Sequence, residues 1–513
     1  MLVKLSRLVQ ENPALDKVKI RKSYTINTLT IAWIVVPFLS GFIGYLLSRW
    51  AKYLSLITSV ISLAYSLLLF SQSAPITLNL LDNYGVKLVA DQLSAYFILT
   101  NALVTMAVIL YNWESSKTAF FYAQAIILHG SINSVFVCED FISVYVALEV
   151  ISIAAFLVIA YPRSDRSLWV ALRYLFISNV AMSFYLIGAV LVYKANNSFA
   201  FAGLKDAPPE ALALIFMGLL VKGGIFVSGL WLPMTHSESE TSVSALMSGV
   251  VVKAGIFPLL RCALILEDLD GLIRLFGVLT AIFGVPYMIF EKDSKRMLAF
   301  STIVQLGFIL AAPVVSGFYT LTHGLVKYSL FLLAGVLPSR NFKELQQQSI
   351  PNSLWIAIVI ASFSISGFPL LSGFGAKALT MKNLLPWQEV AINLAAVGTA
   401  IATAKFIFLP HTKVTTGRKL TLSGWLGIIL LLTALFVANA VYFDAYNLGN
   451  ISKALGIIAI GWGLYLGIFK KLSLQLSTAW KQFDNLVGMM AVMLMLLFLL
   501  ILAQLAPSFL AFS

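Results

Sequence analysis

The chain has 513 residues, of which 60% are hydrophobic and only 11% are charged. A soluble chain of this length carries about a quarter charged residues and fewer than about half apolar ones. The apolar residues also fall in runs of about 18–28, the length that crosses a bilayer. The composition therefore predicts an integral, multi-pass membrane protein. It excludes a soluble enzyme, a nucleic-acid-binding module, a disordered protein and a secreted disulfide scaffold. The net charge of +13 is spread over many short loops, so it does not indicate a nucleic-acid partner.

The first predicted element is a basic segment, residues 1–28, without a continuous apolar core or a small-residue cleavage site. We expect it to lie on the membrane surface as an amphipathic segment rather than to act as a secretion signal. About sixteen apolar runs follow, and they lack the alternation of barrel strands, so they predict α-helices. The expected fold is an all-α polytopic membrane protein with about 14–16 transmembrane helices. We divide it into N-terminal helices (29–118), two repeats (119–266 and 272–409) and C-terminal helices (421–513).

The orientation follows from the basic residues of the loops. About 16 lysines and arginines lie in loops after odd-numbered spans, against about 7 in the other loops, or about 13 with the N-terminal segment. Because short loops obey the positive-inside rule best, we expect the loops after odd spans in the cytoplasm and the N-terminus outside. The basic residues ahead of the first span oppose this assignment.

Charged residues inside the predicted spans are the strongest functional signal. A charge at the bilayer centre costs at least about 2.5–3.5 kcal/mol, so such residues usually pair inside the bundle or line a hydrated path. For Arg173 and Lys405, snorkelling to a helix end is an equal alternative. The basic residues are Lys222, Lys253, Lys327, Lys377, Arg173 and Lys405, and the acid is Glu149.

Lysine suits a proton path because two opposing effects can place its pKa near neutrality. Desolvation lowers the pKa of a lysine, whereas a nearby carboxylate such as Glu149 raises it again. Histidines titrate near neutral pH and can bridge such sites. His129, His236 and His323 lie in or beside spans, and for each of them a purely structural role is an equal alternative.

Two of the lysines lie where helices should break. Lys222 precedes a pair of glycines, and Lys377 follows Gly367, Pro369 and two further glycines. Breaks of this kind are tolerated in a span where the freed backbone lines a cavity, and paired breaks often mark the ion site of a transporter. The two lysines are five spans apart, which predicts two five-helix repeats of inverted orientation.

These residues carry a resemblance to a known family. The segments DFISVYVALEV (140–150), VKGGIFVSGLWLPMTHSESETSVSALMSGVVVKAGIFPLLR (221–261), DSKRMLAFSTIVQLG (293–307), HGLVKYSLFLLAG (323–335) and SGFPLLSGFGAK (366–377) resemble the antiporter-like subunits shared by complex I and the Mrp-type cation/proton antiporters. The resemblance covers roughly residues 90–410. It implies a fourteen-helix core with inverted repeats, embedded in a larger complex and moving protons along a hydrated central axis.

By motif position, the resemblance also implies roles for individual residues. Glu149 looks like the fifth-helix glutamate that is paired with the broken-helix lysine, Lys222. Lys253 looks like the connecting lysine of the eighth helix, and Lys377 like the lysine of the broken twelfth helix. Lys327 with His323 resembles the eleventh-helix site, and His236 matches a loop histidine. Asp140, Lys405 and His129 form a second set of candidates.

The subtype is also suggested by the motifs. SALMSGVVVKAGIFPLLR and the lysine at 377 resemble the D-type Mrp subunit more than the complex I subunits. The chain length also fits the D-type subunit and not the much longer A-type. The loop LPMTHSESETSVSA departs from the family pattern, which usually has an acidic residue before Ala-His and a proline-rich stretch before the SAL motif. Met234, Ser239, Thr241 and Ser242 take these places. The basic N-terminal extension and the extra C-terminal helices also exceed the D-type core.

The leading hypothesis is therefore a proton-translocating subunit of an Mrp-type sodium (or other cation)/proton antiporter, in a prokaryotic or another energised membrane such as the thylakoid. The alternative is a proton-pumping subunit of an NADH (or ferredoxin):quinone oxidoreductase. A scaffold with a defunct channel would be expected to lose key lysines, and all of them are present. No GxGxxG after a strand and no cysteine cluster occurs, since Cys138 and Cys262 stand alone, so we expect no cofactor, no metal and no catalytic chemistry in this chain. The expected partners are other membrane subunits, protons and a monovalent cation.

Overall fold

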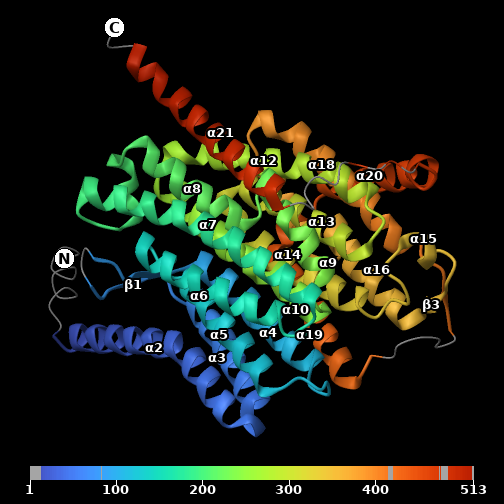
Figure 1. Cartoon of the computed structure of the whole chain (residues 1–513), viewed down its shortest axis with the longest axis horizontal. Coiled ribbons are helices and arrows are strands. Elements are labelled where there is room, and N and C mark those ends of the chain that lie inside the picture. The colour runs from blue at the N-terminus through green and yellow to red at the C-terminus, as the bar shows by residue number, and fades with distance from the viewer. Residues whose placement is uncertain are drawn as a thin grey trace, which may run out of the picture.

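The computed structural model describes residues 13–81, 84–413, 420–472, 474, 476 and 483–510. It confirms an all-α membrane fold, in which the helices pack side by side into one bundle (Figure 1). The first ten helices are α2 (Pro13–Leu46), α3 (Ala51–Phe70), α4 (Gln92–Tyr111), α5 (Ala119–Val135), α6 (Phe141–Ile159), α7 (Asp165–Asn196), α8 (Pro209–Gly223), α9 (Leu232–Glu238), α10 (Thr241–Leu246) and α11 (Val252–Ile265). They are followed by α12 (Glu267–Phe290), α13 (Ser294–Ala311), α14 (Ser316–Ala334), α15 (Phe342–Leu345), α16 (Asn352–Ser366), α17 (Ser372–Lys382), α18 (Pro386–Ile407), α19 (Leu422–Asn439), α20 (Leu448–Leu464) and α21 (Phe483–Leu510).

The strands are short and lie at the ends of the bundle. β1 (Ile76–Asn79) pairs antiparallel with β2 (Lys87–Ala90), with Ile76 opposite Ala90. β3 (Ile350–Pro351) pairs in parallel with β4 (His411–Thr412). The second pairing ties together two loops that are distant in the sequence, and both pairings leave the helices to form the core.

Eleven helices of the described ranges are long and apolar enough to cross a membrane, or twelve if α13 and α14, which meet at 107°, are counted as one bent span. The sequence prediction of about 14–16 spans also counts shorter or interrupted apolar helices. These include α5 with 17 residues, α16 with 15 and the apolar part of α21. The chain is therefore an integral multi-pass membrane protein whose span count depends on how broken helices are treated.

Several helices begin at a side chain that accepts a hydrogen bond from the first turn. Asp91, Asp140 and Asp293 do this for α4, α6 and α13. Ser164 and Ser167 form a reciprocal capping box at the start of α7. Because the first amides of a helix lack an internal partner, these caps fix where each span enters the bundle.

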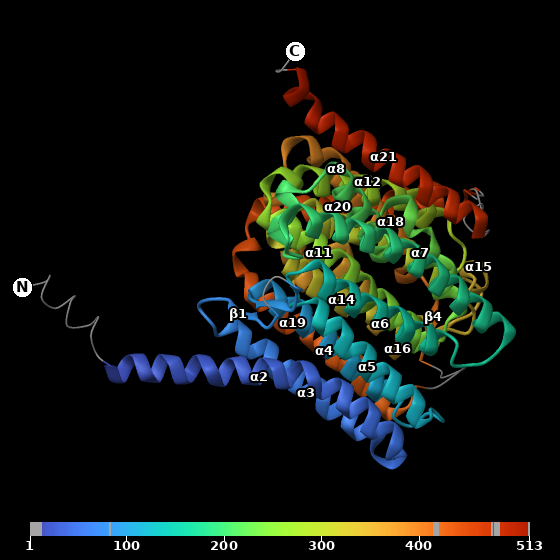
Figure 2. The ribbon, with the colours of Figure 1, turned by 60° about the vertical axis from the view of Figure 1, so that its left-hand side comes forward.

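The two ends of the chain differ from the middle. In Figure 2 the N-terminal part of α2 extends away from the bundle, and α21 lies diagonally across it over α8. No break separates residues 13–28 from the first apolar run, since both belong to α2; residues 1–12 of the predicted N-terminal segment lie outside the described residues. The division into domains and the inverted repeats stay predictions.

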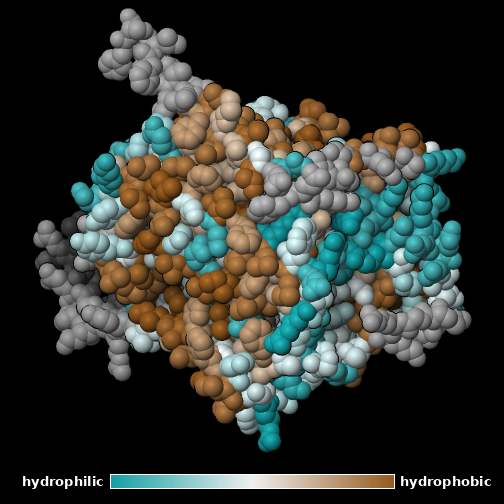
Figure 3. All heavy atoms as spheres, viewed as in Figure 1, coloured by the Kyte–Doolittle hydropathy of each residue, from teal (hydrophilic) through white to brown (hydrophobic). Residues whose placement is uncertain are grey.

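Polar and apolar side chains occupy different parts of the surface. Figure 3 shows a broad apolar face and a polar region at the right of the view, on the side where Figure 1 places α15 and β3. Glu238, Glu240 and Asp293 form ion pairs with Arg166, Lys117 and Arg340 in loops and at helix ends. Such a polar end beside an apolar belt is the pattern of a membrane protein at the water interface.

Candidate functional site

The first buried lysine lies where its helix breaks. α8 ends at Gly223, and Gly224 caps it with a φ of +69°, a conformation that glycine adopts at little cost. The side chain of Lys222 is 2% exposed. Its Nζ donates hydrogen bonds to Ser152 Oγ at 2.5 Å and Ser178 Oγ at 2.6 Å. The two hydroxyls are 2.8 Å apart, so neutral groups of α6 and α7 hold this ammonium.

Glu149 lies one turn before Ser152 on α6 and is half-buried. It interacts electrostatically with Lys222, although the ion pairs of the described residues include none between the two. The carboxylate can therefore act on the lysine by its charge while the serine hydroxyl lies beside it. A group placed in this way tunes a lysine without locking its proton in a salt bridge.

Lys253 follows a second irregularity. Met247–Val251 form a π-helical turn between α10 and α11, and such turns rearrange backbone hydrogen bonds and often occur at functional sites. The buried Lys253 Nζ donates to the carbonyl oxygen of Ser248 at 2.5 Å. Ser248 Oγ in turn lies 2.7 Å from Thr302 Oγ1 on α13. The irregular turn thus supplies the acceptor that this lysine needs.

The backbones of the two irregular helices touch. A β-carbon at Gly255 of α11 would overlap the amide nitrogen of Gly223. Because only glycine permits such an approach, the break that carries Lys222 and the helix that carries Lys253 are held together.

Lys327 and His323 occupy successive turns of α14, and both are buried. Lys327 Nζ donates to the carbonyl oxygen of Leu298 at 3.2 Å. Lys253 interacts electrostatically with Lys327, and both lysines act on His323. The structure therefore brings these three predicted residues into one cluster.

His236 lies in α9 beside the same cluster. Its ring is fully buried and stacks on Phe331 of α14, with 5.0 Å between the ring centroids. It interacts electrostatically with Lys327 and, more strongly, with Lys295. Lys295 Nζ donates to the carbonyl oxygen of Ser239 at 3.1 Å. Lys295 is not among the residues predicted from the sequence, because a loop is expected there, whereas it is in the first turn of α13 and only 7% exposed.

The second broken helix repeats the design of the first. α16 ends at Ser366, Gly367 caps it with a φ of +87°, and α17 begins at Ser372. A β-carbon at Gly373 would overlap the carbonyl oxygen of Ser364, so the two halves of the broken helix pack backbone to backbone. Lys377 Nζ donates to the carbonyl oxygen of Ser366 at 3.2 Å. A backbone carbonyl near the end of α16 therefore faces the ammonium.

Many buried polar atoms along this axis have no protein partner. Buried polar groups in proteins are almost always hydrogen-bonded, so these atoms mark positions for water molecules. A small cavity of about 10 Å³, room for roughly one water, lies between His323 and Lys377. The unpartnered atoms are both ring nitrogens of His236 and of His323, and the hydroxyls of Thr320, Thr322, Tyr328, Ser362, Ser364 and Ser372.

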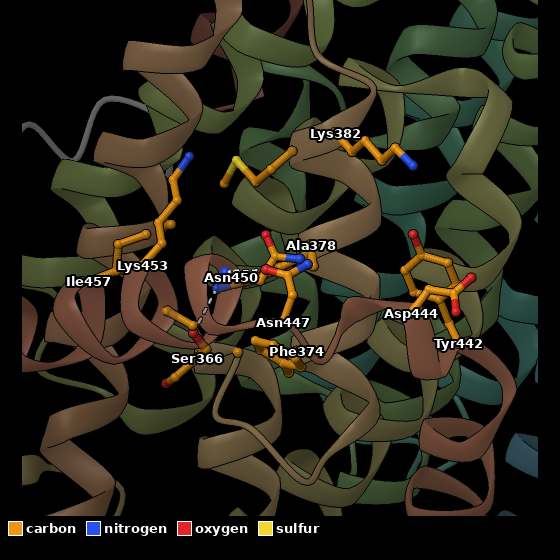
Figure 4. Close-up of a pocket in the computed structure, with 15 residues that line it drawn as sticks. Ser366, Phe374, Ala378, Lys382, Tyr442, Asp444, Asn447, Asn450, Lys453 and Ile457 are labelled. Atoms are coloured by element: carbon orange, nitrogen blue, oxygen red, sulfur yellow. Dashed lines mark hydrogen bonds between the residues drawn. The ribbon is translucent and has the colours of Figure 1, made fainter.

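Lys377 also lines a much larger cavity of about 400 Å³, which we call the vestibule. Figure 4 shows Lys382 and Lys453 framing one part of it and Asp444 in another. Asn447 and Asn450 lie between them. The vestibule is lined mainly by α17, α18, α20 and the segment between α19 and α20, so a helix outside the predicted repeats completes it. No sequence signal linked these residues to Lys377, because they are about 70 positions away.

The second set of candidates, Asp140, Lys405 and His129, makes contacts that stabilise the fold. Asp140 accepts hydrogen bonds from the amides of Ser143 at 2.7 Å and Lys87 at 2.9 Å, which start α6 and hold β2. His129 lies in a satisfied polar network between α3, α4 and α5. Lys405 Nζ donates to two carbonyl oxygens at the end of α12. These contacts favour structural roles, and any part in transport stays a prediction.

In the ranges that the structure describes, no three His, Cys, Asp or Glu side chains come together as a metal site would require. Cys138 and Cys262 are buried free thiols. The chemistry that the arrangement itself offers is proton transfer between lysines, histidines and hydroxyls.

Comparison with known proteins finds a matching family and similar chains. The family described as NADH:quinone oxidoreductase/Mrp antiporter, transmembrane, matches residues 138–403. The chain is 29% identical over 365 residues to the N subunit of the NADH-quinone oxidoreductase of Desulforudis audaxviator, and the match covers 63% of this chain and 72% of that protein. It is 25% identical over 421 residues to the D subunit of the Na(+)/H(+) antiporter of Alkalihalophilus pseudofirmus, and this match covers 73% of this chain and 84% of that protein.

Two solved structures share the fold. A chain of the Mrp complex from Dietzia sp. aligns with a TM-score of 0.75 and 22% identity over 90% of this chain, but over only 58% of the Dietzia chain. A chain of the membrane-bound sulfane sulfur reductase, an archaeal respiratory membrane complex, aligns with a TM-score of 0.71 and 21% identity over 85% of this chain and 99% of the archaeal one. At these identities the likeness concerns the fold.

Proposed function

Because this chain belongs to the NADH:quinone oxidoreductase/Mrp antiporter transmembrane family, we propose that it is the proton-translocating membrane subunit of a multisubunit cation/proton antiporter. It exchanges protons for sodium or another monovalent cation, and it works within an assembly of other membrane subunits. The similar chains of known structure come from multisubunit complexes, which supports the proposal that this chain assembles with other membrane subunits.

The observation that carries the proposal is a series of buried lysines and a buried histidine, with the half-buried Glu149 at its start, between the two broken helices. The series starts at Glu149 and Lys222, continues through the cluster of Lys253, Lys327 and His323, and ends at Lys377, where the vestibule opens. A buried ammonium is costly in a span, and residues of this kind usually mark an ion pathway or pair inside the bundle. This stretch of the bundle holds several, together with polar atoms that lack protein partners.

In the proposed mechanism, the charge of Glu149 favours the protonated form of Lys222. Loss of that influence favours release of the proton toward Lys253, since like charges at neighbouring lysines repel. His323 and the cavity beside it relay the proton from Lys327 to Lys377. The vestibule then connects Lys377 with one side of the membrane.

The alternative is a proton-pumping subunit of a quinone oxidoreductase. The oxidoreductase relative, which is slightly more identical to this chain than the antiporter relative, favours this alternative. The same residues would carry protons in both cases, and redox energy from other subunits would replace the cation gradient.

The test is proton flux in everted vesicles that contain the whole native complex. After energisation without NADH, sodium, potassium, lithium and choline are added in turn while a fluorescent dye reports the pH gradient. We expect one of the inorganic cations to collapse the gradient in wild type and not in Lys222→Ala. Lys194→Ala, which removes an exposed lysine at the end of α7, is the matched control and should retain the response.

Lys222→Ala should still assemble, because Ser152 and Ser178 can hydrogen-bond to each other once the ammonium is gone. If no cation acts on wild type, but a reductant with quinone drives pumping, the chain belongs to the redox alternative. Full transport in Lys222→Ala would overturn the proton path itself.

A further inference from the structure

A second cluster of lysines lies far from the proposed proton path. It lines a recess of about 220 Å³ where α12, α18 and the helical turn after α20 end together with α15. This is the end of α20 opposite to the vestibule. Its loops are those for which the charge distribution of the sequence predicts a cytoplasmic position. We call it the basic recess, and its five lysines are Lys292, Lys343, Lys405, Lys470 and Lys471.

The charges of the basic recess are only partly neutralised from within, since one acid acts on Lys405 and four further lysines share the lining. Its lining contains one acid, Glu291, whose Oε1 accepts hydrogen bonds from the backbone amides of Lys292 at 2.8 Å and Asp293 at 3.1 Å. That carboxylate therefore serves the turn before α13. Lys405 is fixed by the carbonyl oxygens of Ile289 at 2.5 Å and Glu291 at 2.9 Å, so one ammonium is held rigidly at the back of the recess.

Exposed apolar side chains adjoin the basic recess. Leu466, Ile468 and Leu472 are each between 44% and 50% exposed, and they belong to the helical turn and the residues after it that also supply Tyr465, Lys470 and Lys471. Gln346 Nε2 donates a hydrogen bond to Tyr465 OH at 3.2 Å, which ties the loop after α15 to this turn. The site thus combines a cationic polar hollow with an adjoining apolar surface at the end of the helices.

From this combination we infer that the basic recess binds the phosphate headgroup of an anionic phospholipid. Lysine ammoniums bind phosphate as point charges, and basic pockets between membrane helices on the cytoplasmic side bind anionic headgroups. The acyl chains pass along the exposed apolar residues. A free phosphate ion would use the lysines and would gain nothing from that surface.

The inference is tested with the purified full-length chain in detergent after removal of bound lipid. Phosphatidylglycerol and phosphatidylcholine are titrated separately, and native mass spectrometry measures the bound lipid. We expect wild type to prefer phosphatidylglycerol, and Lys470→Gln/Lys471→Gln to lose about tenfold or more of that affinity, since each lysine near an anionic headgroup contributes a severalfold factor. Both lysines are exposed, so the double variant should fold.

The matched control is Lys194→Gln/Lys205→Gln, which removes two exposed lysines elsewhere and should leave lipid binding unchanged. A third arm adds inorganic phosphate at the lipid concentration. Displacement of phosphatidylglycerol by equal inorganic phosphate would show that the ligand is the free ion, and so would overturn the lipid assignment. Equal binding of the two lipids, or equal loss in both double variants, would overturn it as well.

Discussion

Three buried histidines of this protein lie in two regions with opposite hydrogen bonding. His129, 1% exposed, is satisfied on both ring nitrogens: Nδ1 lies 3.0 Å from Thr105 Oγ1 and Nε2 lies 2.8 Å from Ser62 Oγ. His236 and His323, 0% and 2% exposed, have no protein partner on any ring nitrogen. Burial alone therefore does not distinguish these histidines, whereas their hydrogen bonding does.

The difference lies in what surrounds each ring. The His129 network joins α2 and α3 to α4 and α5, because Trp33 and Asn133 also donate to Ser62 Oγ, at 3.1 and 3.2 Å. A fully connected polar network of this kind rigidifies an interface. Around His236 and His323 lie the lysine ammoniums, and unpartnered hydroxyls continue along α14 and α16. The first region is arranged to hold helices together, and the second leaves its polar atoms available to water and protons.

Among substitutions that distinguish the two histidine regions, His323→Ala is expected to have the largest effect, which is on transport. If the ring relays protons, the initial rate of cation-driven collapse of the pH gradient should fall by about tenfold or more. The thermal stability of the solubilised complex should fall less than in His129→Ala, because a cavity is created but no protein hydrogen bond of the ring is lost. Transport at the wild-type rate would show that His323 is only a packing residue.

The next largest effect is expected from chemical labelling of the vestibule wall. Ala378→Cys places a thiol on its wall, and the two native cysteines are buried. A membrane-impermeant thiol reagent applied from the side of the loop between α19 and α20 should slow transport severalfold, and from the other side it should have little effect. Ala361→Cys, on the buried part of α16, is the matched control. Equal reactivity from both sides would rule out a one-sided entrance.

The two regions also differ in how far they can be predicted from the sequence. Charged residues in apolar runs are conspicuous, so Lys222, Lys253, Lys327 and Lys377 could be selected without a structure. The hydroxyls of Ser152 and Ser178 could not, because serines occur in most spans and only packing shows which ones contact the ammonium. The helical fold and both breaks were predictable from composition and from the glycines, since these signals are local.

Other parts of the site depend on the arrangement of distant segments. Asp444 and Asn447 lie in what the sequence shows as an ordinary polar connection, yet they face the cavity that Lys377 lines. Lys295 was missed because helix boundaries are uncertain by a few residues. The satisfied state of His129 could not be predicted, because its partners come from other helices.

For the His129 network we expect a smaller effect, and one on stability rather than on transport, opposite to the expectation for His323. His129→Ala should destabilise the solubilised complex by about 1–3 kcal/mol through the lost hydrogen bonds, measured by thermal unfolding. Transport per folded complex should stay within about twofold of wild type, because the ring lies outside the series of lysines. A loss of transport at unchanged stability would instead move His129 into the proton path.

The smallest expected effect concerns a satisfied group outside the spans, Asp91, which caps α4. Burial raises the pKa of its carboxyl, but the hydrogen bonds and charge of Arg261, at 2.5 and 2.8 Å, outweigh this and hold the pKa below its usual value. A lowered pKa means that the carboxylate stabilises the fold fully above its unfolded-state pKa, about 3.9, and loses this contribution as the pH falls through the lower, folded-state value. Asp91→Asn should therefore lower the melting temperature by a constant amount between pH 7 and 5, and the difference from wild type should shrink below about pH 4. The exposed Asp206, replaced by Asn as a control, should show no such dependence. A difference that is the same at every pH would mean that Asp91 acts through its hydrogen bonds and not through its charge.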